Sequence, residues 1–160
     1  MIYPKDLHSG DLETLLARYG LSLAMVTEGE PIPGSFWGDS EAGLIDDRVY
    51  ARPDTPLHSI LHESCHYICM DSSRRDGLHT DAGGDYDEEN GVCYLQLLLA
   101  DRLQGIGKAR QFDDMDAWGY SFRLGSSRAW FEQDAEDAVA WLQGHGLIDS
   151  QKIPTWQLRN

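Results

Sequence analysis

One stretch decides the fold of this 160-residue chain: TPLHSILHESCHYICM, at residues 55–70. Thr55 is a residue type that favours the N-cap of a helix. Pro56 suits the first helical position, because it has no N–H group to leave unbonded. Apolar side chains that can pack such a helix against a core recur at Leu57, Ile60, Leu61 and Ile68. The stretch therefore predicts a packed helix from Thr55 to about Met70.

The same stretch carries the motif His62-Glu63-Ser64-Cys65-His66. Two histidines four residues apart lie on one face of a helix, where both rings can bind one metal ion. Glu63 lies beside the first histidine, where a carboxylate can take a proton from a metal-activated water. The motif predicts a metal site with His62 and His66 as ligands and Glu63 as general base. The plainer interpretation is a helix whose two histidines face solvent or hydrogen-bond partners.

A catalytic zinc ion usually has three protein ligands and one open position, so a third ligand must come from elsewhere in the chain. An acidic cluster at residues 85–89 begins the next predicted helix. Glu88 shares a face with apolar residues of that helix, and burying a carboxylate there is costly unless something pairs with it. Glu88 is therefore favoured as the ligand over Glu89, whose more mixed face includes Cys93 and Gln96. The other acid would only offset the helix dipole.

Further side chains are candidates around such a site. His79, in the loop between the two ligand segments, is an alternative third ligand. His58 lies one helical turn before His62, where it would hold a ligand, touch substrate, or simply be an exposed polar residue. Tyr120 would donate a hydrogen bond to a developing oxyanion, or would only pack. The cysteines at positions 65, 69 and 93 are expected to be small buried hydrophobic residues rather than nucleophiles.

The rest of the pattern predicts one α+β domain over residues 1–160, with a small mixed or antiparallel sheet packed on the 55–70 helix. Further helices are expected at Ser9–Tyr19, Asp87–Leu103, Lys108–Trp118 and Ser126–Gln143. Strands are expected at Leu21–Thr27, Ser35–Trp37, Ala42–Ile45 and Val49–Ala51, with a hairpin turn at Asp46-Asp47. Residues 71–85 are predicted to form a loop, and the tail after residue 150 has no predicted element.

Charge and composition disfavour some kinds of binding partner for this chain. The chain has 13 basic and 27 acidic residues, for a formal net charge of −14. Such a surface repels phosphate backbones and anionic lipids, which disfavours nucleic-acid and membrane binding and favours a basic peptide or protein partner. No segment approaches the ~20 apolar residues of a membrane span. An odd number of cysteines and no signal-peptide pattern predict free thiols in the cytoplasm.

The region from Ser35 to Leu103 resembles the zincin metallopeptidases, in particular small bacterial gluzincins and the ImmA/IrrE type. The resemblance rests on a strand hairpin, the His62–His66 motif helix and an acidic residue on the following helix. It implies a zinc peptidase with a short twisted sheet on one side of the motif helix. By the same resemblance His62, His66 and Glu88 bind zinc, Glu63 is the general base, and the sheet edge lines an extended peptide.

A second resemblance implies a different chemistry. Residues 28–32, the stretch 62–69 and the pair Arg74-Arg75 are similar to elongation factor P hydroxylase. That family implies an iron site on the motif helix that hydroxylates a modified lysine of a translation factor, so Fe²⁺ is the alternative to Zn²⁺. A third possibility is a zincin-like scaffold that only binds a partner. The intact Glu63 disfavours it, because a purely structural metal site needs no base.

Overall fold

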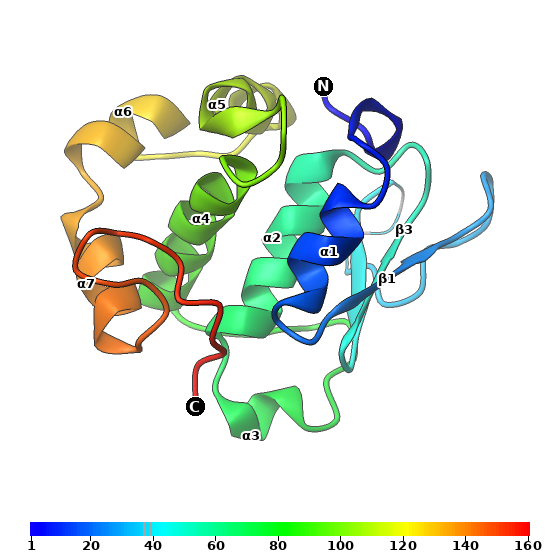
Figure 1. Ribbon diagram of the computed structural model, residues 1–160, viewed down its shortest axis with the longest axis horizontal. Coiled ribbons are helices and arrows are strands. Elements are labelled where there is room, and N and C mark those ends of the chain that lie inside the picture. The colour runs from blue at the N-terminus through cyan, green and yellow to red at the C-terminus, as the bar shows by residue number, and fades with distance from the viewer. Residues whose placement is uncertain (37, 39) are drawn as a thin grey trace.

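A small mixed sheet lies on one side of a central helix, and most of the remaining helices lie on the other side (Figure 1). The computed structural model describes residues 1–36, 38 and 40–160. Its sheet consists of β1 (Ser22–Met25), β2 (Gly43–Ile45) and β3 (Arg48–Ala51) in the order β1-β3-β2. Strand β1 pairs with β3 in parallel, whereas β2 pairs with β3 antiparallel. The predicted α+β class and mixed sheet are confirmed.

The hairpin between β2 and β3 forms as predicted. Asp46 and Asp47 make the turn, and Asp46 has a φ of +52°, a left-handed conformation that short polar residues tolerate better than most. The strand predicted at Ser35–Trp37 does not form at Ser35 and Phe36, and Trp37 lies outside the described residues. Instead, the Ser35 hydroxyl donates to the Gly38 carbonyl and accepts from the Gly38 N–H, which closes a local turn.

The predicted motif helix is α2 (Leu57–Cys69). Its N-cap is Pro56 rather than Thr55, because the Thr55 hydroxyl accepts a hydrogen bond from the Arg52 N–H at 2.8 Å instead. The helix contacts β2 and β3 on one side and α4 (Tyr86–Ala100) on the other. It is therefore buried on both sides, and its polar residues are held in fixed surroundings.

The other helices follow the predictions with two differences. Helices α1 (Asp11–Ala17) and α5 (Gly107–Trp118) form, and the short α3 (Ser72–Arg75) lies inside the predicted loop 71–85. The helix predicted at Ser126–Gln143 is two helices, α6 (Ser127–Gln133) and α7 (Glu136–Gly144). Asp134 leaves the helical conformation between α6 and α7. Its carboxylate makes an ion pair with Arg123. A 3₁₀ turn at Pro4–Asp6 precedes α1.

The C-terminal tail folds back over the helices (Figure 1). Trp156 packs against Tyr19, with ring centroids 5.4 Å apart, and the Arg18 guanidinium lies 3.5 Å from the Trp156 ring centroid. Further along, the Arg159 N–H donates to the Ile68 carbonyl at 3.0 Å. The tail thereby connects α1 to the end of α2.

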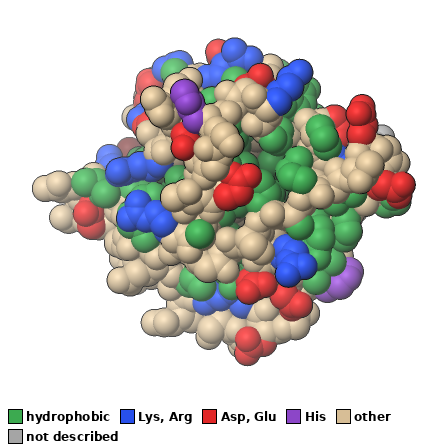
Figure 2. Space-filling model, turned by 45° about the vertical axis from the view of Figure 1, so that its right-hand side comes forward, with side chains coloured by type: hydrophobic (Ala, Val, Ile, Leu, Met, Phe, Trp, Pro, Cys, Tyr) green, Lys and Arg blue, Asp and Glu red, His purple; other side chains and the backbone are tan. Residues whose placement is uncertain are grey.

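The surface carries charges of both signs, and the thiols lie beneath it. In Figure 2, acidic and basic side chains are interspersed with hydrophobic ones, so no single-signed patch covers that face. Among the described residues, no helix is long and apolar enough to cross a membrane. Cys65, Cys69 and Cys93 are buried and unpaired, as expected.

Candidate metal centre

Three side chains from α2 and α4 converge on one point. His62 Nε2 lies 3.0 Å from Glu89 Oε1, His66 Nε2 lies 3.2 Å from Glu89 Oε2, and the two Nε2 atoms are 3.1 Å apart. One turn of α2 separates the histidines, and Glu89 reaches them from the first turn of the neighbouring helix. His66 is buried, whereas the Glu89 side chain is 47% exposed, so the group opens to solvent on one side.

The spacing of these atoms fits a single metal ion. Within the described residues, the ligand atoms of His62, His66 and Glu89 all lie within 4.8 Å of one another. Bonds of about 2.0–2.1 Å at angles of about 100–110° would place neighbouring ligand atoms about 3.1–3.4 Å apart, close to the separations found here. Two imidazoles and a carboxylate suit zinc, iron or other divalent metals. The group could therefore hold a divalent cation of either predicted kind.

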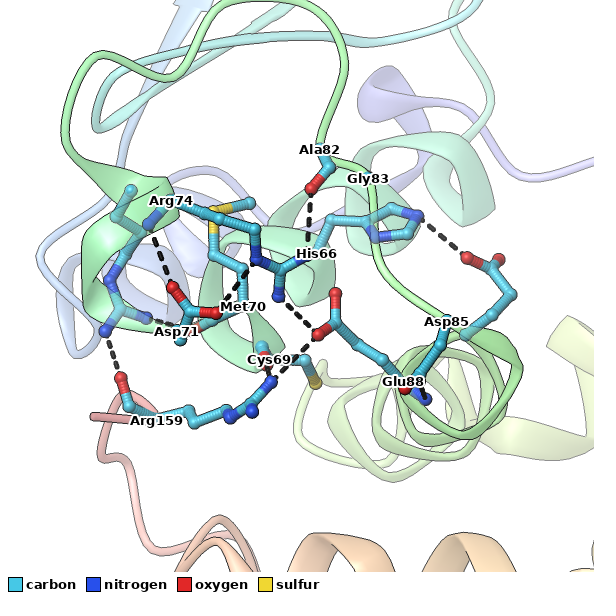
Figure 3. Close-up of polar contacts among 12 residues, drawn as sticks. His66, Cys69, Met70, Asp71, Arg74, Ala82, Gly83, Asp85, Glu88 and Arg159 are labelled. Atoms are coloured by element: carbon cyan, nitrogen blue, oxygen red, sulfur yellow. Dashed lines mark hydrogen bonds and ion pairs between the residues drawn. The ribbon is translucent and has the colours of Figure 1, made fainter.

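Glu89 replaces Glu88 as the acid that joins the histidines. Successive helical residues point about 100° apart, so the two carboxylates face different surroundings. Glu88 is only 3% exposed, and its Oε1 accepts hydrogen bonds from Arg74 at 2.5 Å and Arg159 at 2.9 Å (Figure 3). The prediction that a buried Glu88 needs a charged partner is confirmed, but two arginines provide the charge. The preference for Glu88 over Glu89 is thus corrected.

Electrostatics within the group show which charges a metal would meet. Burial raises the pKa of the Glu89 carboxyl, but the hydrogen bonds to His62 and His66 outweigh it and hold that pKa well below its usual range. Burial lowers the pKa of His62, yet Tyr120, Cys93 and Glu89 together raise it well above the ordinary value. Because a histidine binds a metal ion only in its neutral form, a metal ion would compete with a proton at His62.

Gln96 orients the first histidine, a role that sequence reasoning missed. Its Oε1 lies 2.7 Å from His62 Nδ1, and its Nε2 donates to the His58 carbonyl at 3.3 Å. Gln96 is almost fully buried at 1% exposure. The sequence does contain one indication of this role: Gln96 lies seven residues, or two helical turns, after Glu89 and so shares its helical face.

Glu63 lies beside the group in a cleft of about 510 Å³ that His62, His66 and Glu89 also line. Burial raises the pKa of Glu63, while His66 and His62 lower it and Glu89 raises it further. The net result is a carboxylate of raised basicity next to the three converging groups, which suits a proton acceptor.

Tyr120 and His58 form one wall of the same cleft. Tyr120 Oη lies 3.1 Å from His58 Nδ1, and the Tyr120 ring centroid is 5.6 Å from that of His62. His58 is 1% exposed and its ring packs against Trp118, so it is not the exposed polar residue of the plainer interpretation. Burial, with a smaller contribution from His62, lowers the pKa of His58 to about 4. Burial raises the pKa of Tyr120 to about 12, which keeps its hydroxyl protonated.

His79 does not join the two histidines. Its side chain is exposed and its Nδ1 lies 2.6 Å from the Thr80 hydroxyl. The backbone around it instead pairs with β2: the Asp46 N–H donates to the Leu78 carbonyl and the Thr80 N–H to the Leu44 carbonyl, each at 2.9 Å. This pairing covers part of the outer edge of β2, whereas β1 is the other edge strand of the sheet. The expectation that a sheet edge lines an extended peptide stays a prediction.

The cleft is acidic. Four carboxylate residues line it, namely Glu41, Glu63, Asp81 and Glu89, together with the rings of Phe36, Trp118 and Tyr120. No lysine or arginine is among the described residues of the lining. Burial and the nearby Glu63 raise the pKa of Glu41. A hydrogen bond with Trp118 lowers that pKa and so offsets part of the increase. Once a divalent cation balances Glu89, an excess of negative charge remains.

No family model matches this chain, and no curated protein or solved structure is significantly similar to it.

Proposed function

We propose that this protein is a metal-dependent hydrolase, most simply a zinc peptidase of zincin type. The observation that carries the proposal is the convergence of His62, His66 and Glu89 at one wall of an open cleft, with the Glu63 carboxylate beside them. A short sheet on one side of the motif helix supports the resemblance to zincins. The third ligand is Glu89 in this proposal.

The metal ligands, Glu63 and Tyr120 have different roles in the proposed hydrolysis. A divalent cation bound by His62, His66 and Glu89 would supply the acidity that makes water a nucleophile near neutral pH and polarises a carbonyl. Glu63 takes the proton of the attacking water and passes it to the leaving amine, as its raised pKa and its position in the cleft favour. Tyr120 keeps its proton and donates a hydrogen bond toward the developing oxyanion.

The substrate in this proposal is a peptide or protein segment with a basic residue near the scissile bond. The acidic residues of the cleft wall would attract a lysine or arginine side chain. The rings of Trp118 and Phe36, which are 39% and 55% exposed, offer faces on which a guanidinium can stack.

A second candidate function shares the ligand set. Two histidines and one carboxylate also hold Fe²⁺ in oxygenases that leave other positions open. The resemblance to elongation factor P hydroxylase therefore stays the alternative, and a site used only for binding is the third. Glu63 favours hydrolysis among them, because a carboxylate base beside the metal ligands serves a water-activating site.

Elemental analysis by plasma mass spectrometry of protein purified without an affinity tag tests the proposal. We expect one zinc per chain in the wild type and none in His66→Ala or Glu89→Ala. One iron per chain would instead favour the hydroxylase, and an oxygen-consumption assay would follow. A chain that binds neither metal, even after metal is added back, would contradict the metal site.

Turnover is tested on the same material with a peptide library. Glu63→Gln should keep the wild-type zinc content and lose hydrolysis by roughly 10²- to 10⁴-fold, because it removes the proton acceptor but no ligand. His8→Gln, an exposed histidine outside the cleft, is the matched control and should behave as wild type. Equal activity in Glu63→Gln and wild type would remove Glu63 as the base.

A further inference from the structure

We propose that Arg159, the residue before the C-terminus, is a positioning residue for the metal centre. Acting through Glu88, it fixes the turn of α4 that carries Glu89. This inference rests on the proposed function, since it takes His62, His66 and Glu89 as metal ligands. It assigns the C-terminal tail to the same site, although the tail lies outside the cleft lining.

Arg159 joins the end of α2 to the start of α4. Its Nη1 lies 2.9 Å from Glu88 Oε1 in the first turn of α4 and also donates to the Cys69 carbonyl at 3.2 Å, in the last turn of α2. Its backbone N–H donates to the Ile68 carbonyl at 3.0 Å. Figure 3 shows Arg159 and Arg74 converging on the Glu88 carboxylate from different segments.

Arg75 holds the tail in place from the other side. Its Nη1 donates to the carbonyls of Tyr67 and Met70 at 3.1 and 2.8 Å, and its Nη2 donates to the Arg159 carbonyl. Cationic side chains are favourable at a helix C-terminus, where carbonyls lack partners within the helix. Two guanidinium groups therefore cap α2, and the one from the tail also holds Glu88.

The buried carboxylate has little freedom to move. Glu88 is 3% exposed, and a Cβ atom at Gly84 would lie 2.3 Å from Glu88 Oε2, so the chain before α4 lies directly against it. That Oε2 atom has no hydrogen-bond partner among the described residues, so both arginines act on Oε1. The position of Glu88 is thus set by two cations and a glycine backbone.

Fixing Glu88 also fixes Glu89, because the two are consecutive in one helical turn. Metal–ligand distances in a well-formed site lie within about 0.2 Å of their standard values. A rotation of α4 by about 10° would move a carboxylate about 6 Å from the helix axis by about 1 Å. Releasing the Arg159 contact therefore costs metal affinity even though Arg159 touches no ligand.

The test compares zinc affinities, measured by competition with a chromophoric chelator, for wild type, Arg159→Gln and Arg159→Lys. We expect Arg159→Gln to weaken zinc binding by roughly 10- to 100-fold, in line with outer partners of metal ligands. Arg159→Lys keeps the cation and should recover part of the affinity. The visible absorption of the Co²⁺-loaded proteins should change in Arg159→Gln, because ligand geometry around the ion changes.

Arg123→Gln is the matched control, because it breaks another arginine–carboxylate pair outside the cleft lining. It should bind zinc as the wild type does, and unfolding in urea shows that each variant is folded. If wild type binds zinc and Arg159→Gln binds it equally well with an unchanged Co²⁺ spectrum, the positioning role is wrong while the metal site stands. If wild type itself binds neither zinc nor iron, the metal site and the positioning role are both wrong.

Discussion

The Gln96 side chain makes two hydrogen bonds that together determine which ring nitrogen of His62 carries the proton when the ring is neutral. Because its amide Nε2 donates to the His58 carbonyl, its Oε1 faces His62 and can only accept. His62 Nδ1 must then carry a proton, which leaves the lone pair of Nε2 directed toward Glu89 and His66 in the neutral ring. This assignment follows from the hydrogen-bond network. Gln96 thus prepares His62 to bind a metal.

Replacing Gln96 should therefore weaken metal binding without removing a ligand. Gln96→Met keeps the volume of the side chain and loses the acceptor, and we expect a roughly 10- to 100-fold increase in the dissociation constant for zinc. Chelator competition measures it. The matched control is Gln111→Met, at another buried glutamine whose amide atoms have no partner among the described residues. Equal zinc affinity in the two variants would contradict the role of Gln96.

His58 predicts a pH dependence of stability in the metal-free protein. Burial lowers its pKa to about 4 in the folded chain, so between pH ~6.5 and ~4 the unfolded chain binds a proton that the folded chain does not. The free energy of unfolding is therefore not reduced by His58 above pH ~6.5. It falls by up to about 3 kcal/mol as the pH drops from ~6.5 toward 4, because protonation then stabilises the unfolded chain.

Urea unfolding at pH 7 and pH 4.5 measures this effect against two variants. His58→Phe keeps a ring against Trp118 and should lose less stability between the two pH values than wild type does. His8→Gln, at an exposed histidine, should keep the wild-type difference. A His58→Phe variant with the full wild-type pH dependence would show that other groups are responsible.

At the scale of elements, the correct predictions depend on neighbours within a few residues. The motif helix, the hairpin turn at Asp46-Asp47 and the histidine pair follow from periodicity and turn chemistry alone. The choice of third ligand failed because Arg159, 71 residues after Glu88, lies against it only in the folded chain. The single helix predicted at residues 126–143 is also wrong: Asp134 leaves the helical conformation and pairs with Arg123, a residue outside the predicted helix.

Gly91 sets how closely α7 approaches α4. A Cβ atom there would lie 2.7 and 2.9 Å from two ring carbons of Trp141, so the two helices can come this close only because position 91 has no side chain. Gly91→Ala gains up to ~1 kcal/mol of helix propensity, but the clash should outweigh it. We expect a net loss of about 1–3 kcal/mol in the free energy of unfolding, measured in urea.

Gly144→Ala is the control for that substitution, because Gly144 lies at the end of α7 and a Cβ atom added there would meet no heavy atom within 4 Å. It should be neutral or slightly stabilising. A Gly91→Ala variant as stable as wild type would mean that α7 can shift without cost, and that the packing of α4 against α7 does not hold α4 in place.

At the scale of the whole molecule, negative charge is present both in total and in the cleft. The formal net charge of −14 raises the local concentration of cationic partners. On the face in Figure 2 the two signs are interspersed, whereas the described lining of the cleft has carboxylates and no lysine or arginine. The overall charge should therefore affect the rate of encounter with a substrate, and the cleft should affect which substrate is preferred.

These two effects can be separated with a pair of peptides that differ only in lysine or glutamine beside the scissile bond. Raising the ionic strength from ~0.01 to ~0.15 M shortens the screening length from about 30 to about 8 Å. The preference for the lysine peptide, measured as a ratio of kcat/KM values, should fall with salt. Glu41→Gln should lower this preference at fixed salt by roughly 1.5- to 5-fold. Glu28→Gln removes the same charge at an exposed position outside the cleft lining, so it should leave the preference nearly unchanged. If both variants lower it equally, the total charge of the protein rather than the cleft selects the substrate.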